Sequence, residues 1–221
     1  MGKFATKLFP PVYSHWLETR LNGTVTESLA TCDNCAMVTP SGLTRDPGPF
    51  KNHLKCCTYF PFIPNFGLGA MINAKSAEAT LRLRTAQQQG ILLPLGLHTT
   101  PERQLQIESF GTEGFGKHDE LICPFFDKQS FGCSVWQFRP GVCTTYFCKS
   151  DRGFEGLDFW GEVESYLNNF EWTLAKEVYF RLGFTEDDFE MCKATMSIEE
   201  PGEEREHFLN ASWGKWISKK D

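Results

Sequence analysis

The longest regular pattern in the chain lies in its last third. Apolar residues recur there at spacings of three and four, which places them on one side of an α-helix. They are Trp160, Val163, Leu167, Phe170, Leu174 and Val178. Gly183 follows, and glycine commonly ends helices because it adopts positive φ without strain. The pattern predicts a long helix from Glu155 to Leu182.

Further helix signals follow this segment. Thr185 is a good N-cap, and the acidic residues after it favour the first turn of a short helix. The acidic segment 199–206 predicts a solvated turn, and residues 207–220 predict a terminal helix. We therefore expect a helical C-terminal third.

The first 120 residues give weaker and more varied signals. Residues Ala70 to Gln89 are rich in helix formers and are followed by Gly90, so they predict a helix. Short apolar or alternating runs at 91–97 and 103–110 predict strands. A short helix is expected at 14–21, a loop at 39–49, an irregular packed segment at 58–69 and a glycine-rich connection at 111–120.

Together these elements predict an α+β fold. We expect a single domain over 1–221, with an irregular cysteine-rich metal-binding core and short strands at 31–150. The helical region at 155–221 is expected to pack on that core.

Charge and hydropathy narrow the classes of partner. The formal net charge of −6 disfavours a nucleic-acid surface. No apolar run approaches the length of a signal-peptide core or a membrane-spanning helix. We therefore expect a soluble, cytoplasmic protein with neither nucleic acid nor a membrane as partner. The chain itself does not identify its protein or small-molecule partner.

Cysteine is the residue type that suggests chemistry. Disulfides rarely persist in the cytosol, so a cytosolic chain with nine cysteines more often binds metal or performs thiol chemistry. Four thiolates match one tetrahedral zinc or one cubane iron–sulfur cluster. Cys192 stands alone in an expected helix and is interpreted as a core residue. The other eight form two sets of four along the chain: Cys32, Cys35, Cys56 and Cys57, then Cys123, Cys133, Cys143 and Cys148.

The first set contains one strong and one awkward feature. Cys32 and Cys35 form a C-x2-C turn, which lets both sulfurs reach one ion. Adjacent side chains in extended backbone point to opposite sides, so Cys56 and Cys57 cannot easily bind the same ion together. His53 is an alternative ligand, and a nucleophilic pair of His118 with Cys123 is a further alternative.

The second set carries a resemblance. The residues concerned are Cys123-Pro124-Phe125, Cys133 with Trp136, Arg139-Pro140, Cys143 and Cys148. In this order they resemble the second half of the zinc- or iron-chelating family known for its CxxCxxCC motif. The first half departs from that motif, because Val38 occupies a position where the family has cysteine and the double cysteine arrives only at Cys56. The resemblance covers about residues 31 to 150 and implies metal binding, without a biochemical role.

Iron–sulfur is the favoured cofactor, and Zn²⁺ is the alternative. Zinc sites favour two short C-x2-C turns and this chain has one, whereas irregular spacings and a Cys-Pro pair occur at iron–sulfur clusters. Side chains expected to surround the ligands are Arg139, Trp136, Phe125 and Tyr146. We expect a redox or modification role for a cysteine-ligated metalloprotein. The alternatives are a zinc-stapled structural or partner-binding module and a thiol redox protein. No residue stands out as a general acid or base, so the question of enzymatic activity stays open.

Overall fold

The computed structural model describes residues 3–4, 10–14, 17, 26–28, 32–39, 48–75, 77–197 and 203–219. These residues form two compact units. Unit 1 comprises Met1–Tyr59 and Thr112–Asn169, and unit 2 comprises Phe60–Gly111 and Phe170–Asp221. The expectation of a single domain, with its helical region packed on the cysteine core, stays a prediction.

Unit 1 holds short elements joined by turns. Two antiparallel strand pairs are present, and the remaining elements of the described part of the unit are 3₁₀ turns and helices. The pairs are β1 (Lys3–Phe4) with β2 (Thr26–Glu27) and β6 (Phe126–Asp127) with β7 (Gly132–Cys133). The 3₁₀ turns are η2 (Cys32–Asn34), η3 (Asp119–Leu121) and η4 (Trp136–Phe138), and the helices are α5 (Gly141–Thr145) and the first part of α6 (Gly153–Arg181).

The core of unit 1 is centred on Trp160 of α6. Its ring is fully buried and stacks on Phe147, with 4.4 Å between ring centroids. Its indole Nε1 donates to the buried carboxylate of Glu27 at 2.9 Å. The same carboxylate accepts from Ser150 Oγ at 2.5 Å and from the backbone N–H of Asp151 at 2.9 Å. Glu27 thus joins β2 to the segment that leads into α6.

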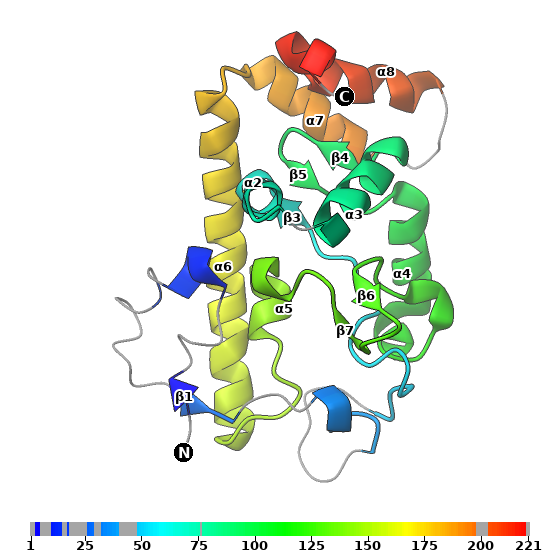
Figure 1. Cartoon of the computed structure of the whole chain (residues 1–221), viewed down its shortest axis with the longest axis vertical. Coiled ribbons are helices and arrows are strands. Elements are labelled where there is room, and N and C mark those ends of the chain that lie inside the picture. Colours follow the sequence, from blue (N-terminus) through cyan, green and yellow to red (C-terminus); the bar gives the residue numbers. More distant parts are fainter. Residues whose placement is uncertain are drawn as a thin grey trace. The chain divides into compact units, whose positions relative to one another are not determined.

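Unit 2 combines helices with one small antiparallel sheet. The strand order is β3-β5-β4, and β4 and β5 form a hairpin. The elements are β3 (Ile63–Pro64), α2 (Asn65–Asn73), α3 (Ala77–Gln88), β4 (Leu92–Leu93), β5 (Gly96–Leu97), the first part of α4 (Pro101–Gly114), the end of α6, α7 (Glu186–Ser197), α8 (Glu203–Ser212) and η5 (Gly214–Lys219). The helices α7 and α8 pack side by side (Figure 1).

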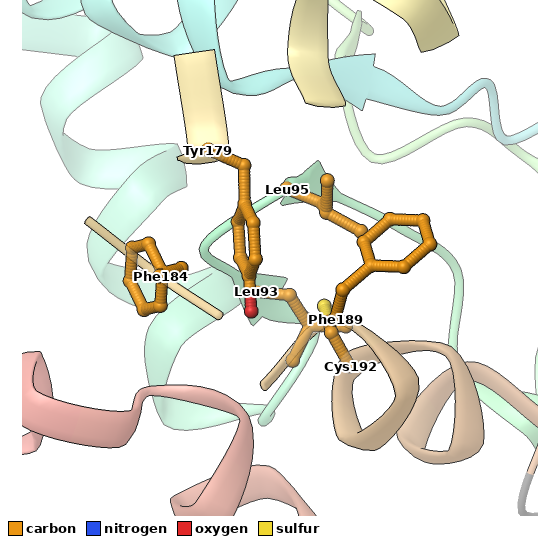
Figure 2. Close-up of a cluster of buried hydrophobic side chains, with 6 residues drawn as sticks. All are labelled: Leu93, Leu95, Tyr179, Phe184, Phe189 and Cys192. Atoms are coloured by element: carbon orange, nitrogen blue, oxygen red, sulfur yellow. The ribbon is translucent and has the colours of Figure 1, made fainter. Parts of the chain in front are cut away.

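One core cluster of unit 2 gathers around Tyr179, near the end of α6. Figure 2 shows its ring between Phe184 on one side and Leu93 and Leu95 of the β4–β5 hairpin on the other. Phe184 stacks on the ring with centroids 4.2 Å apart. Cys192 lies in the same cluster and is fully buried, as expected for a core thiol.

Several sequence predictions are confirmed. The structure mixes helices with few short antiparallel strands, and the C-terminal third is helical in the described ranges. The long helix is α6, and the run at 91–97 is the β4–β5 hairpin. At the start of α7, Thr185 Oγ1 accepts from the N–H of Asp188 at 3.1 Å, and the Asp188 carboxylate accepts from the N–H of Thr185 at 2.7 Å. This reciprocal cap is what the sequence signals there favour.

Other predictions are wrong, for identifiable reasons. The run at 103–110 is part of α4 and not a strand, because Thr100 caps the N–H of Arg103 at 3.1 Å and Pro101 fits the first helical position. The expected helix at 70–89 is two helices, since Lys75 adopts a φ of 52° after α2. Within the expected irregular segment at 58–69, β3 forms and α2 begins.

The remaining predictions concern the acidic segment at 199–206 and two segments near the N-terminus. Residues 203–206, expected in a solvated turn, begin α8, and Arg205 there is buried. Most of the expected helix at 14–21 and of the loop at 39–49 lies outside the described residues. No helix within the described ranges has both the length and the apolar character needed to cross a membrane.

Candidate metal centre

All eight candidate cysteines belong to unit 1. They come from short, irregular elements that bring distant parts of the chain together. Cys32 begins η2 with Cys35 just after it, Cys56 and Cys57 lie in a run of turns, Cys123 follows η3, Cys133 ends β7, Cys143 lies on α5 and Cys148 follows that helix. Cys32 is exposed and the other seven are half-buried.

The thiols are close enough to interact electrostatically. Cys56 has the most such neighbours, since its charge raises the pKa values of the thiols of Cys32, Cys133, Cys143 and Cys148. Cys35 also acts on Cys32 and on Cys148, and Cys123 acts on Cys143. The two sets of four along the sequence therefore form one neighbourhood in space.

The grouping in space differs from the order in the chain. Cys148 belongs to the second set by sequence, yet its thiol interacts with Cys35 and Cys56 of the first. Cys143 interacts with Cys123, Cys133 and Cys56. Cys56 thus interacts with thiols of both sets, and sequence order alone could not have assigned Cys148.

Cys56 and Cys57 do not point to opposite sides, as extended backbone would require. Their side chains are joined by a hydrogen bond, which is the largest cause of a pKa well above the usual value for Cys56. The backbone there forms turns. The N–H of Lys55 donates to the Lys51 carbonyl at 2.9 Å, and the N–H of Cys57 donates to the Leu54 carbonyl at 3.1 Å. Lys55 itself has a φ of 56°. These turns allow the adjacent thiols to meet.

A backbone hydrogen bond ties the two sets together. The N–H of Cys123 donates to the carbonyl of Cys57 at 2.7 Å. The β6–β7 hairpin then brings Cys133 opposite Phe126. The N–H of Ser134 closes the hairpin by donating to the carbonyl of Phe125 at 2.9 Å. Residues 57 and 123–134 thus form one connected framework for the thiols.

Burial keeps several of these thiols protonated. It is the largest cause of the raised pKa values of Cys32, Cys133, Cys143 and Cys148. Neighbouring thiolates raise these values further. A coordinated metal ion acts in the opposite direction, because it deprotonates the thiols that bind it. Binding of a thiophilic cation to these cysteines would therefore release protons from the thiols.

Arg139 places a positive charge among the thiols. Its guanidinium interacts with Cys32, Cys56, Cys133 and Cys143, while burial lowers its own pKa. Three contacts fix the side chain: Nε donates to the Trp136 carbonyl at 3.2 Å, Nη1 donates to the Cys143 carbonyl at 3.2 Å, and the guanidinium carbon lies 3.3 Å from the Trp136 ring centroid.

Lys55 supplies a second cation. Its side chain is buried, and Nζ donates to the Phe131 carbonyl at 2.9 Å. Its charge lowers the pKa of Cys32, against the larger effect of burial. Lys55 and Arg139 are thus placed to offset negative charge on a thiolate cluster.

The aromatic side chains near the cysteines are unevenly buried. Phe125 is 3% exposed, whereas Trp136 is 49% exposed. Tyr146 is half-buried and meets Phe115 edge-on, with centroids 5.5 Å apart. The expected aromatic surroundings therefore cover one part of the neighbourhood and leave the Trp136 side open to water.

The two histidines considered as alternatives, His53 and His118, each lie near a carboxylate. His53 Nε2 lies 2.5 Å from Asp119 Oδ1, and Lys51 pairs with the other oxygen of the same carboxylate. Lys51 first, then His53, lowers the pKa of Asp119 to about 2. His118 Nδ1 lies 3.9 Å from Glu120. Sequence reasoning missed the exposed trio of Lys51, His53 and Asp119, because Asp119 lies 66 residues after His53 and no motif connects the two segments.

The thiols are neighbours without forming a ready-made coordination site. Across the described ranges, no three or more His, Cys, Asp or Glu side chains are arranged to hold a metal ion. The type and number of donors fit a sulfur-ligated metal, and the sulfurs would have to draw together to bind it.

Comparisons with protein-family models, with curated proteins and with solved structures gave no match to this chain.

Proposed function

We propose that unit 1 is a cysteine-ligated metalloprotein module that binds an iron–sulfur centre and has a redox role. One observation carries the proposal: thiols from segments as far apart as Cys32 and Cys148 lie in one electrostatic neighbourhood that includes Arg139. The partial resemblance to the zinc- and iron-chelating family supports metal binding independently of this arrangement.

Core packing explains these thiols less well. Cys192 shows what a packed thiol looks like in this chain, since it is 0% exposed among leucines and aromatic rings. Each of the eight candidate ligands is at least partly exposed. A group of neighbouring thiols from distant segments is more typical of a sulfur-ligated metal than of a packed core.

The arrangement favours two overlapping groups of ligands. Cys32, Cys35 and Cys148 interact with one another, and Cys143 interacts with Cys123 and Cys133. Cys56 interacts with members of both groups, and Cys32 also acts on Cys133. An iron–sulfur centre supplies one-electron transfer when it is bound. In this chain, Arg139 and Lys55 would balance the negative charge of the thiolates.

A thiol redox function is the second candidate, favoured by the hydrogen bond between Cys56 and Cys57. The raised pKa of Cys56 argues against it, because the thiolate is the reactive form and reactive cysteines have lowered pKa values. Metal binding is therefore the better-supported function.

The deciding experiment is the metal and sulfide content of the anaerobically purified full chain, together with its absorption spectrum. We expect iron and acid-labile sulfide in stoichiometric amounts, and a visible absorption band that weakens on reduction with dithionite. Colourless protein with stoichiometric zinc would replace iron–sulfur by the zinc-stapled module. Protein that contains neither metal after anaerobic reconstitution would overturn the proposal.

Two matched variants connect the metal to the site. Cys143→Ser removes a thiol that interacts with three others, so we expect iron and sulfide content to fall by at least half. Cys192→Ser removes the core thiol of unit 2 and should leave both contents unchanged. Equal metal loss in the two variants would contradict the assigned ligands.

A further inference from the structure

Unit 2 contains a group of buried polar atoms without hydrogen-bond partners. In the part of the chain that the structure describes, all five side-chain atoms of this kind belong to this unit. They are His98 Nε2, Thr99 Oγ1, Tyr179 OH, Arg205 Nε and Trp213 Nε1. Buried polar groups nearly always have partners, so such a group points to a bound water or ion.

Arg205 is the charged member of the group. Its side chain is 9% exposed on α8, and Nη2 donates to the carbonyl of Gly90 at 3.3 Å. Gly90 follows α3, whose C-terminal end carries about half a negative charge. No carboxylate pairs with Arg205 among the described residues. A buried guanidinium with only this partial compensation needs further negative charge.

His98 lies close to this guanidinium. The side chain is 7% exposed, and its backbone N–H donates to the Ile91 carbonyl at 3.0 Å, next to Gly90. Burial first, and then the charge of Arg205, lowers its pKa to about 4, against a hydrogen bond to the Thr99 backbone. The imidazole is therefore neutral at pH 7. Because its ring N–H donates to the Thr99 backbone, the unpartnered Nε2 is left as a hydrogen-bond acceptor.

One side of α8 carries Arg205 and Leu209 and lies against Gly90. Arg205 and Leu209 are one helical turn apart, and both lie over Gly90: a Cβ there would be 3.6 Å from Arg205 Nη1 and 3.2 Å from Leu209 Cδ2. Leu209 also packs against the Tyr179 cluster. Figure 2 shows the Tyr179 hydroxyl at the end of the ring away from α6. Gly90, His98 and Leu209 thus lie around the buried positive charge of Arg205.

We propose that Arg205 binds a small anion beneath α8, of the carboxylate or inorganic oxyanion class. Arg205 Nε can only donate a hydrogen bond, and the hydroxyl of Thr99, the residue after His98, can donate as well. The site therefore favours a ligand rich in acceptors. A water molecule would satisfy single hydrogen bonds, but it would not neutralise the guanidinium. This site is separate from the proposed metal centre.

The test is thermal unfolding of the full chain in formate, acetate, phosphate and chloride at constant ionic strength and constant metal content. By linkage, the binding anion should raise the Tm by about 5 to 10 °C at one hundred times its Kd. Arg205→Met should lose this shift, whereas Arg152→Met, at an exposed arginine of unit 1, should keep it. The anion that acts distinguishes a carboxylate from an inorganic oxyanion ligand.

Hydrogen exchange of the wild-type chain gives a second measurement, which does not depend on the folding of a variant. The same anion should slow exchange in peptides that cover 90–98 and 203–212, at least threefold, and leave peptides of unit 1 unchanged. Absence of a Tm shift with every anion would overturn the proposal. So would an equal shift in Arg205→Met, or a high-resolution crystal structure grown in the anion that shows only water at Arg205.

Discussion

At the scale of single residues, Glu27 has the most consequential side chain outside the proposed sites. Its buried carboxylate accepts hydrogen bonds from Trp160, Ser150 and Asp151, which lie more than 120 residues further along the chain. The exposed carboxylate of Asp151 extends the connection, since it accepts from the backbone N–H and from the hydroxyl of Ser28 at 2.9 Å each.

Replacing Glu27 should therefore destabilise unit 1. Glu27→Ala leaves the buried indole N–H of Trp160 without this acceptor, and we expect a loss of about 3 kcal/mol in the free energy of unfolding. Glu27→Gln keeps the size of the side chain and should cost about half as much. Urea denaturation followed by near-ultraviolet circular dichroism measures both losses.

The control is Glu162→Ala, at an exposed position of α6. It should change the free energy of unfolding by no more than about 0.5 kcal/mol. A loss for Glu27→Ala that is no larger than for this control would show that the three hydrogen bonds do not stabilise the fold.

Sequence reasoning reaches different residues unequally well. The thiol of a cysteine suggests metal or redox chemistry wherever it lies, so the eight candidate ligands could be selected before their positions were known. Glu27 and Arg205 gave no such signal, because acidic and basic residues are usually exposed and only tertiary structure buries them. The proximity of Cys148 to Cys35 is likewise a product of the fold.

At the scale of elements, α4 contains a sharp irregularity. Gly111 has a φ of 56° and a ψ of −158°, a conformation almost restricted to glycine. The sequence predicted a glycine-rich connection at 111–120, and the structure has two helical segments that meet at this break, the second of which ends at Gly114. The cap at Thr100 favours a helix and Gly111 favours a break, and the structure contains both the helix and the break.

Two alanine substitutions at uncrowded glycines test the effect of backbone strain on stability. A Cβ at Gly111 or at Gly161 would meet no atom within 4 Å. Gly111→Ala should lower the free energy of unfolding by about 1 to 3 kcal/mol, because alanine is strained in this conformation. Gly161 lies inside α6, so Gly161→Ala should raise it by about 0.5 to 1 kcal/mol. Thermal and urea denaturation should give opposite signs, and a shared sign would refute the assigned strain.

At the scale of the whole molecule, the units interleave along the chain. The sequence predicts one domain, with a cysteine-rich region at 31–150 and a helical region at 155–221. The two compact units divide at Tyr59, Gly111 and Asn169, so that α6 belongs to both. Hydrophobic periodicity reports local structure and carries no information on which distant segments pack together.

Metal removal should distinguish the units, if the proposed centre is present. Chelation under reducing, anaerobic conditions should speed hydrogen exchange in peptides that cover 32–39, 48–59 and 119–148. Metal-binding energy is folding energy for the segments that carry the ligands. Peptides that cover 91–97 and 186–197 of unit 2 should keep their protection. Equal loss of protection in both units, or none in unit 1, would contradict a metal that stabilises unit 1 alone.

The interleaving also sets an order of events during synthesis of the chain. Unit 1 is completed only after the first segment of unit 2 has been translated, since residues 60–111 lie between its two parts. Cys148 is added 91 residues after Cys57 (148 − 57). At about 5 to 20 residues per second, the early thiols leave the ribosome roughly 5 to 18 seconds before the last one. A nascent chain therefore exposes an incomplete set of cysteines during that interval, and a full complement of ligands exists only once translation has passed α5.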